Sequence, residues 1–180
     1  MKKRKTQVHI MRNDFHKYYD SEAESGKIIR IAKNHYTLFY GKGVDEENEK
    51  AIFVWRKDYD HLPTRLEAKT DVEALINGMT DKKILSGFVW KDNPVWLSSE
   101  NQFNFKAAYD LAFQTNGASL PARYKLGEDE KGNPIYYDFQ DLNTFADFYL
   151  GCMGWIQQCI VEGWKEKDDV DYDSMFGRLE

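Results

Sequence analysis

One short segment combines the residue types that acid–base and metal chemistry use. Asp58, Tyr59, Asp60 and His61 follow one another directly. An imidazole beside carboxylates can act as a general acid or base, or can ligate a metal ion. The segment precedes Pro63, and no helical or strand periodicity fixes its side chains relative to one another. We interpret it as a surface loop and predict neither a catalytic nor a metal-ligating residue there.

The other motifs do not assemble a reaction. No histidine lies three or four residues from another, and there is no nucleophile elbow, phosphate-binding loop or dinucleotide-binding glycine motif. The acidic runs at residues 45–49 and 128–130 lack the spaced oxygens and the distant glutamate of an EF-hand. We therefore expect a protein that is not an enzyme and that has no cofactor.

The two cysteines, Cys152 and Cys159, fall within one predicted helix. At ~1.5 Å of rise per residue they stand roughly 10 Å apart. This exceeds the ~7 Å Cα separation that a disulfide tolerates, so they do not pair with each other. Neither has a histidine or another cysteine at ligand spacing. Small core side chains in a reducing compartment are the favoured interpretation.

The sequence is rich in aromatic side chains, with five Trp, eleven Tyr and eleven Phe. Trp90, Trp96 and Tyr136 could form a face for a glycan or a peptide, since flat rings stack on ligands at little entropic cost. Cross-strand aromatic pairs that stabilise a small sheet are the favoured explanation for most of these residues. An aromatic-rich binding module remains our alternative function.

The overall charge and hydropathy exclude several classes. A net charge of −5 argues against nucleic acid as the main partner, because phosphate neutralisation needs clustered Lys and Arg. The one basic cluster, residues 2–5, is interpreted as a solvated terminus. Residues 6–12 lack the apolar core of a signal peptide, and no window of ~18 apolar residues exists. We expect no secretion signal and no membrane span.

Part of the sequence recurs 40 residues later. Residues 91–98 align with residues 131–138 and share the pattern Lys-x-Asn-Pro. Two aromatic positions recur at the same offset: Phe105 with Phe145, and Tyr109 with Tyr149. Each copy predicts strand, turn, strand and helix. Duplication of a ββα unit and ordinary turn chemistry both remain open, and both predict the same local structure.

The remaining periodicities predict the other elements. Residues 27–32, 36–40 and 51–56 are β-type runs and predict a three-stranded antiparallel meander. A helix follows, beginning at 64 or 70 because capping boxes stand at both, and ending near residues 77–78. One further helical turn ends at Gly87.

In the repeated part, two strand pairs alternate with two helices. The predicted strands are 88–90 and 95–97 around a turn at 91–94, then 123–126 and 135–139. The first helix starts at a capping box over residues 99–102 and ends at residues 116–117. The second starts between residues 138 and 143 and extends to about residue 167.

The last helix is the candidate interaction element. Its residues 148–161 carry no charge, and a helix that is apolar all round must be covered on more than one side. A seam is predicted from three- and four-residue steps at Leu142, Phe145, Tyr149, Cys152, Ile156 and Cys159. Gly151 and Gly154 each cost ~1 kcal/mol in a helix interior, so we expect close approach by another element there. The candidate surface is Phe148, Gly151, Trp155, Cys159 and Trp164.

These elements predict an α+β fold. An N-terminal antiparallel β meander is followed by a helix and two ββα units, and the long C-terminal helix packs on an antiparallel sheet. The predicted organisation is a meander region at 1–62, an α+β domain at 63–170 and a loose tail at 171–180.

From residue 84 onward the pattern resembles a known family. The run Ile-Leu-Ser-Gly-Phe-Val-Trp at 84–90, Asn-Gln-Phe-Asn at 101–104 and Lys-Glu-Lys-Asp at 165–168 carry the resemblance. It covers roughly residues 70–170 and is to a domain of unknown function at the C-terminal end of tailed-phage and prophage tail-associated proteins. The resemblance implies a virion-associated or tail-assembly role in a bacterial host, through self-association or binding of other tail proteins. It transfers no functional residue, and cytoplasmic or virion-associated localisation is expected.

Overall fold

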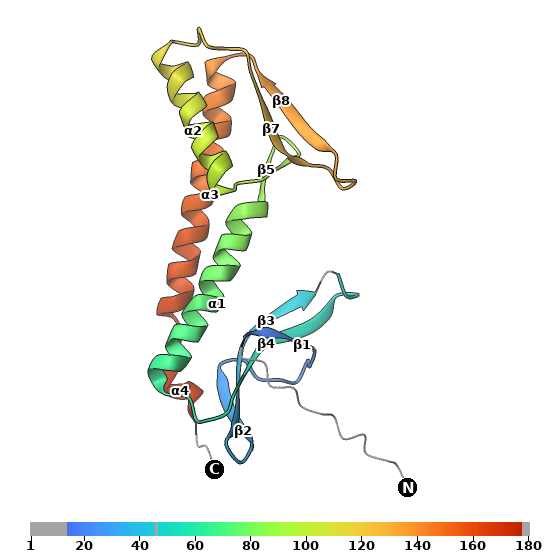
Figure 1. The fold of residues 1–180 in the computed structure, drawn as a ribbon, viewed down its shortest axis with the longest axis vertical. Helices are drawn as coiled ribbons and strands as arrows, with labels where there is room; N and C mark the ends of the chain where they lie inside the picture. The colour runs from blue at the N-terminus through green and yellow to red at the C-terminus, as the bar shows by residue number, and fades with distance from the viewer. Residues whose placement is uncertain (1–13, 46, 178–180) are drawn as a thin grey trace. The chain divides into compact units, whose positions relative to one another are not determined.

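The computed structural model describes residues 14–45 and 47–177, and its α+β fold confirms the predicted class (Figure 1). The basic cluster at residues 2–5 and the segment 6–12 lie outside the described residues. The chain divides into two compact units. Unit 1 comprises residues 1–75 and 169–180, and unit 2 comprises residues 76–168. This division falls inside a helix, whereas the sequence suggested a boundary at residues 62–63.

Unit 1 contains a four-stranded antiparallel sheet in the order β1-β4-β3-β2. Its strands are β1 (His16–Tyr18), β2 (Lys27–Ala32), β3 (His35–Asp45) and β4 (Ala51–Tyr59). The predicted meander is therefore confirmed as β2-β3-β4, and β1 adds a fourth strand on the free edge of β4. Both faces of the sheet bury apolar side chains: Ile28 and Leu38, which pair across β2 and β3, lie on one face, and Val54 lies on the other.

The C-terminal segment of unit 1 is ordered where the structure describes it. It forms the short helix α4 (Tyr172–Met175), which packs near β2. The carboxylate of Asp171 caps this helix by accepting from the backbone N–H of Ser174 at 3.0 Å. Tyr172 and Met175 are buried. A loose tail was expected because this segment is polar, but two apolar side chains suffice to anchor it.

Helix α1 (Arg65–Ser86) begins at the first of the two predicted capping boxes. The backbone N–H of Thr64 donates to the Glu67 carboxylate at 2.7 Å, and the N–H of Glu67 donates to the Thr64 hydroxyl at 3.2 Å. The Thr70 hydroxyl instead bonds inside the helix, to the Leu66 carbonyl at 2.8 Å. The second box therefore starts no helix.

The predicted end of α1 near residues 77–78 is wrong, because the helix continues to Ser86. Its second half packs against the last helix of unit 2, where Thr80 lies directly over Gly163. Lys83 of α1 forms an ion pair with Glu162, which lies on that last helix beside Gly163. Such packing offsets the ~1 kcal/mol that Gly78 costs in a helix. Gly87 ends the helix, as predicted.

Unit 2 contains the two predicted strand–turn–strand–helix units. The first is β5 (Phe88–Trp90), β6 (Asn93–Val95) and α2 (Ser99–Gln114); the second is β7 (Ala122–Glu128), β8 (Pro134–Phe139) and α3 (Leu142–Asp168). Each strand pair is a separate two-stranded sheet. The Trp96 N–H donates to the Leu126 carbonyl at 2.7 Å and joins the two. Both hairpins lie on the same side of α2 and α3 (Figure 1).

The turn of the first hairpin is two residues shorter than the sequence suggested. Lys91 and Asp92 have φ values of 47° and 62°, so they form the central pair of a two-residue turn. Asn93 and Pro94 belong to β6. The Asn93 amide supports the turn by donating to the Lys91 carbonyl at 2.8 Å. The predicted turn at 91–94 and strand at 95–97 are corrected accordingly.

Aromatic rings fill the core of unit 2. Phe139 of β8 stacks on Phe145 of α3 with ring centroids 4.3 Å apart. Phe105 of α2 meets Phe148 of α3 edge to face at 5.0 Å. Between the helices, Tyr109 stacks on Tyr149 at 4.7 Å, and these are equivalent positions of the sequence repeat. The seam predicted for α3 faces the core, where three of its residues are buried: Phe145, Cys152 and Cys159.

Two glycine substitutions test this packing in opposite directions. A Cβ on Gly127 would lie 2.4 Å from the Pro94 carbonyl oxygen, which is backbone and cannot rotate away. Gly127→Ala should lower the free energy of unfolding by about 1–3 kcal/mol. At Gly78, within α1, no atom lies within 4 Å, so Gly78→Ala should raise it by about 1 kcal/mol. Urea unfolding measures both, and equal effects of the two variants would contradict the described hairpin contact.

Candidate functional site

The acid–imidazole segment lies in unit 1, where β4 leads into α1. It borders a pocket of about 540 Å³. The His61 ring contacts two carboxylates, with Nδ1 at 2.8 Å from Asp60 and Nε2 at 3.2 Å from Glu67. These contacts, Asp60 first, raise the pKa of His61 and favour the imidazolium. With both ring nitrogens engaged, His61 acts as a link between β4 and α1.

Asp71 makes a second link between the same elements. Its carboxylate accepts from the Tyr59 hydroxyl at 2.6 Å and pairs with Lys57 at 2.6 Å. Burial, and then the Asp71 contact, raise the pKa of Tyr59, so the phenol stays protonated. These polar groups hold the first turns of α1 against the end of β4.

A buried polar cluster lies within the sheet itself. The Asp58 carboxylate accepts from the Thr37 hydroxyl at 2.6 Å and from Arg56 Nε at 2.9 Å, and all three residues are buried. Partners for buried charges and hydroxyls offset the cost of removing them from water. In the described part of the chain, no group of three or more His, Cys, Asp or Glu could hold a metal ion.

Both cysteines are free and buried in unit 2, as predicted. Burial raises the pKa of the Cys152 thiol to about 12 and also raises the pKa of Cys159. Thiolates are the reactive form of cysteine, so both side chains are unreactive at neutral pH.

The structure distributes the predicted interaction residues over two faces of α3. Phe148 and Cys159 are buried and face the core. Gly151 admits the Phe88 ring, which would lie 3.0 Å from a Cβ at that position. Trp155 lies over the end of α1 and donates from Nε1 to the Lys83 carbonyl at 3.2 Å. These four residues therefore do not lie on one exposed surface, because each faces the core or the end of α1.

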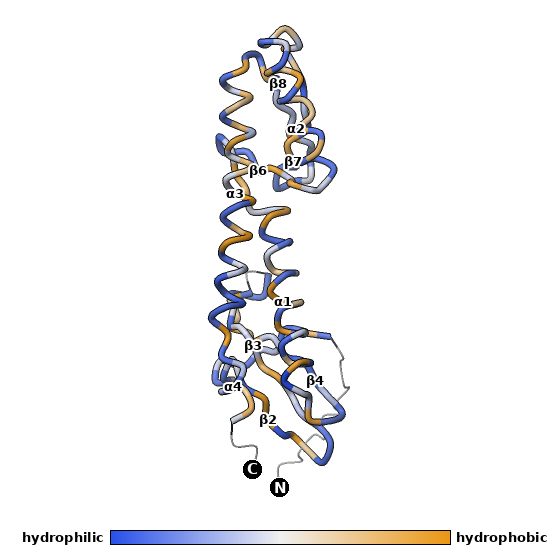
Figure 2. The backbone as a smooth tube through the Cα atoms, turned by 90° about the vertical axis from the view of Figure 1, so that its left-hand side faces the viewer, coloured by the Kyte–Doolittle hydropathy of each residue, from blue (hydrophilic) through white to orange (hydrophobic). Residues whose placement is uncertain are grey.

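Of the five, only Trp164 is strongly exposed, and it belongs to a different set. Four large apolar side chains of α3 are 43–62% exposed: Leu150, Met153, Val161 and Trp164. Gly154 and Gln157 lie between them and are also exposed. We call these six residues the outer stripe of α3. Figure 2 shows apolar residues recurring along this helix.

Gly154 differs from Gly151 in its surroundings. No atom lies within 4 Å of a Cβ built at Gly154, so no neighbour within the described chain requires a glycine there. Only Gly151 therefore fulfils the expected close approach. The uncharged run at residues 148–161 signalled the outer stripe in the sequence, but its position depends on which seam of α3 turns inward.

The predicted aromatic ligand face is also divided. Trp90 is buried in the core, where its Nε1 donates to the Asp147 carboxylate at 2.9 Å. Tyr136 is half exposed and carries the Arg123 guanidinium over its ring at 5.0 Å. Trp96 is 48% exposed and lines a pocket of about 630 Å³. Trp90 is therefore not part of the proposed ligand face, because its ring is packed in the core.

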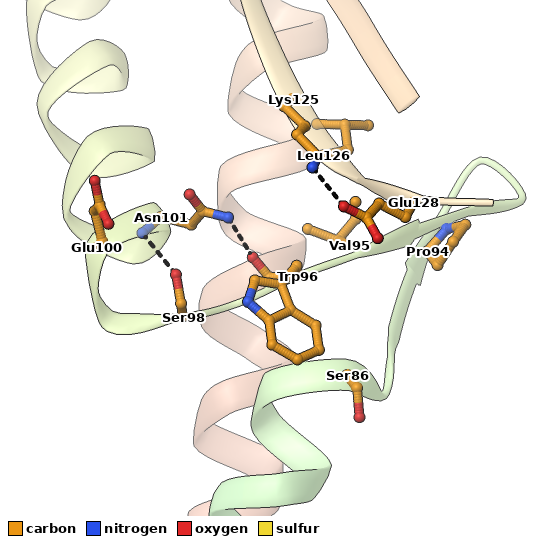
Figure 3. Close-up of a pocket in the computed structure, with 11 residues that line it drawn as sticks. Ser86, Pro94, Val95, Trp96, Ser98, Glu100, Asn101, Lys125, Leu126 and Glu128 are labelled. Atoms are coloured by element: carbon orange, nitrogen blue, oxygen red, sulfur yellow. Dashed lines mark hydrogen bonds and ion pairs between the residues drawn. The ribbon is translucent and has the colours of Figure 1, made fainter. Parts of the chain in front are cut away.

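Four elements contribute to the Trp96 pocket: the end of α1, β6, the first turn of α2 and β7. The Trp96 backbone is fixed on both sides, because its carbonyl also accepts from the Asn101 amide at 2.8 Å. Lys125 and Glu128, both on β7, form an ion pair of 2.7 Å in the same pocket (Figure 3). An exposed ring beside amide and charged groups is suited to a ligand with one apolar face.

The comparisons with known proteins identify no relative from which a function could be inferred. No protein-family model matches this chain, and no match was found among curated proteins or solved structures. In the part that the structure describes, no helix is long and apolar enough to cross a membrane.

The His61 cluster predicts a pH dependence. Because folding raises the His61 pKa, its contribution to stability is complete below the unfolded value of about 6.5 and is lost as the pH rises through the folded value. The pKa of Glu67 is lowered to about 2, chiefly by Thr64, so its contribution is present above about 4.5 and lost as the pH falls toward 2.

Asp60→Asn should lower the His61 pKa, because the hydrogen bond to Asp60 makes the largest contribution to raising that pKa. NMR titration of the ring protons measures this shift. Asp81→Asn, on α1 outside the cluster, is the control and should leave the His61 pKa unchanged. A His61 pKa at or below 6.5 in the unmodified protein would contradict the described contacts.

Proposed function

We propose that this chain is a non-enzymatic structural or assembly protein of phage or prophage origin that acts through a protein–protein surface. The observation that carries the proposal is the outer stripe of α3. Its four large apolar side chains recur over 15 residues while remaining 43–62% exposed. Contiguous exposed apolar surface of this kind marks interaction sites in soluble proteins. The resemblance of residues 84–104 and 165–168 to tail-associated proteins supports the same assignment.

The inner face of α3 supports this role by holding the stripe rigidly. Phe145 and Phe148 are anchored in the aromatic core, and Trp155 covers the end of α1. A helix fixed in this way loses little conformational entropy when a partner binds its outer face. The polar clusters of unit 1 are also explained by structure, since each joins neighbouring elements.

Site-specific photo-crosslinking tests the proposal. A photoreactive phenylalanine analogue replaces Leu150 or, separately, Val161, and the full chain is expressed in its native host. Both positions should yield an adduct with the same protein, identified by mass spectrometry, because both lie on the outer stripe. The analogue at Gln158, an exposed position on another face of α3, is the matched control. No adduct, or the same adduct from the control, would refute this interaction surface.

A second candidate function is binding of a glycan in the Trp96 pocket. The observation that favours it is the exposed indole, whose backbone is held by Leu126 and Asn101 in a pocket that also contains the Lys125–Glu128 ion pair. A pyranose ring could stack its apolar face on the indole while these polar groups accept or donate hydrogen bonds.

Trp96→Ala should reduce glycan binding at least tenfold without changing the unfolding midpoint, because about half of this side chain is exposed. A glycan array followed by titration calorimetry measures binding. Trp90→Ala is the contrasting variant: it should cost about 3–5 kcal/mol of stability, because Trp90 is buried in the core. Absence of binding by the unmodified protein, or binding that survives Trp96→Ala, would eliminate this candidate.

A further inference from the structure

We infer that the partner of the outer stripe is a second copy of this chain, with the two α3 helices antiparallel about a two-fold axis at Gln157. The inference rests on the proposed function, because it names the partner of the same surface. Three observations carry it: the spacing of the stripe, the open space at Gly154 and the charges beside the stripe.

The spacing of the stripe is symmetric about Gln157. Its side chains stand at positions 150, 153, 157, 161 and 164, in steps of three, four, four and three. Such steps keep side chains on one line along a helix. A two-fold axis at position 157 therefore places Leu150 opposite the partner's Trp164, and Met153 opposite the partner's Val161. The surface is complementary to itself, as an isologous dimer requires.

Side-chain size favours the antiparallel arrangement. The antiparallel arrangement sets the largest side chain, Trp164, against a smaller one, the partner's Leu150. A parallel pair would set two indoles against each other at one end. Gly154 provides space beside Met153, and the partner's Val161 reaches this point in the antiparallel pair. That contact accounts for a glycine at position 154. Within the single chain nothing requires one, since no atom lies within 4 Å of a Cβ there.

The flanking charges favour the same direction. Asp147 and Lys165 are 18 residues apart, which is five helical turns, so they lie on the same flank of the stripe. The axis at position 157 brings Asp147 level with position 167 of the partner. The partner's Lys165 is two residues away from that level, which is about 3 Å along the helix axis. Opposite charges meet on this flank of the antiparallel pair, whereas a parallel pair places the equivalent flanks of the two helices on opposite sides of the contact.

The length of the stripe sets the expected affinity. Leu150 and Trp164 are separated by 14 residues, or about 21 Å of helix. A standard interface buries about 800 Å² per partner and uses about 20–30 residues on each side. Six stripe residues give a smaller contact, so the dissociation constant should be micromolar or weaker. The association must be sought at high protein concentration.

Sedimentation velocity of the full chain tests the dimer. Between about 5 and 500 µM the sedimentation coefficient should rise from the monomer toward the dimer value. Val161→Glu should abolish this rise, because it buries a carboxylate in the contact, with an unchanged unfolding midpoint. Leu111→Glu is the matched control: Leu111 lies on α2, outside the stripe, and is 54% exposed against 47% for Val161, so this variant should associate normally.

Cysteine cross-linking tests the direction. A mixture of Leu150→Cys and Trp164→Cys chains should form a mixed disulfide under mild oxidation, whereas Leu150→Cys alone should not. The native cysteines stay silent because they are buried and protonated. Leu150→Cys cross-linking to itself would overturn the antiparallel arrangement.

The inference and the proposed function fail separately. A chain that remains monomeric up to 500 µM overturns self-pairing. If Leu150 and Val161 then photo-crosslink to one different protein, the proposed assembly surface stands with another occupant. If they also give no adduct, both the partner and the surface are wrong.

Discussion

The packing of aromatic rings between α3 and the hairpins is the constraint on which unit 2 depends. Phe139, Phe145 and Phe148 meet at centroid distances of 4.3–6.4 Å, and all three are completely buried. Each such ring removes a large apolar surface from water, and their edge and face contacts restrict the orientation of α3. Once Phe145 and Phe148 turn inward, the rotation of the whole helix about its axis is fixed.

The outer face of α3 follows from that rotation. Side chains of an α-helix are separated by 100°, so an inward Phe145 directs Leu150 and Val161 outward. The two glycines then have different roles. Gly151 accommodates Phe88 within the unit, while Gly154 opens to the exterior. The feature with the strongest functional implication is therefore a by-product of the core, displayed on a rigid helix.

Polar contacts join the elements of unit 1. Thr37, Arg56 and Asp58 satisfy one another inside the sheet, and Asp71 and His61 join β4 to α1. A partly satisfied buried cluster would be costly, so these contacts restrict the register of the strands. The residue types that first suggested acid–base chemistry hold the joint between a strand and a helix.

The sequence by itself determined the α+β class, the meander, both ββα units and the periodic seam of α3, because local periodicity and capping residues encode them. It placed the end of α1 at Asn77 and Gly78, since helix propensity there is low; packing of Thr80 on Gly163 overrode that preference. It also grouped Trp164 with the buried Phe148. Only the tertiary structure decided which residues of an uncharged helix lie outside, because every face of such a helix is apolar enough to be buried and the choice rests on shape.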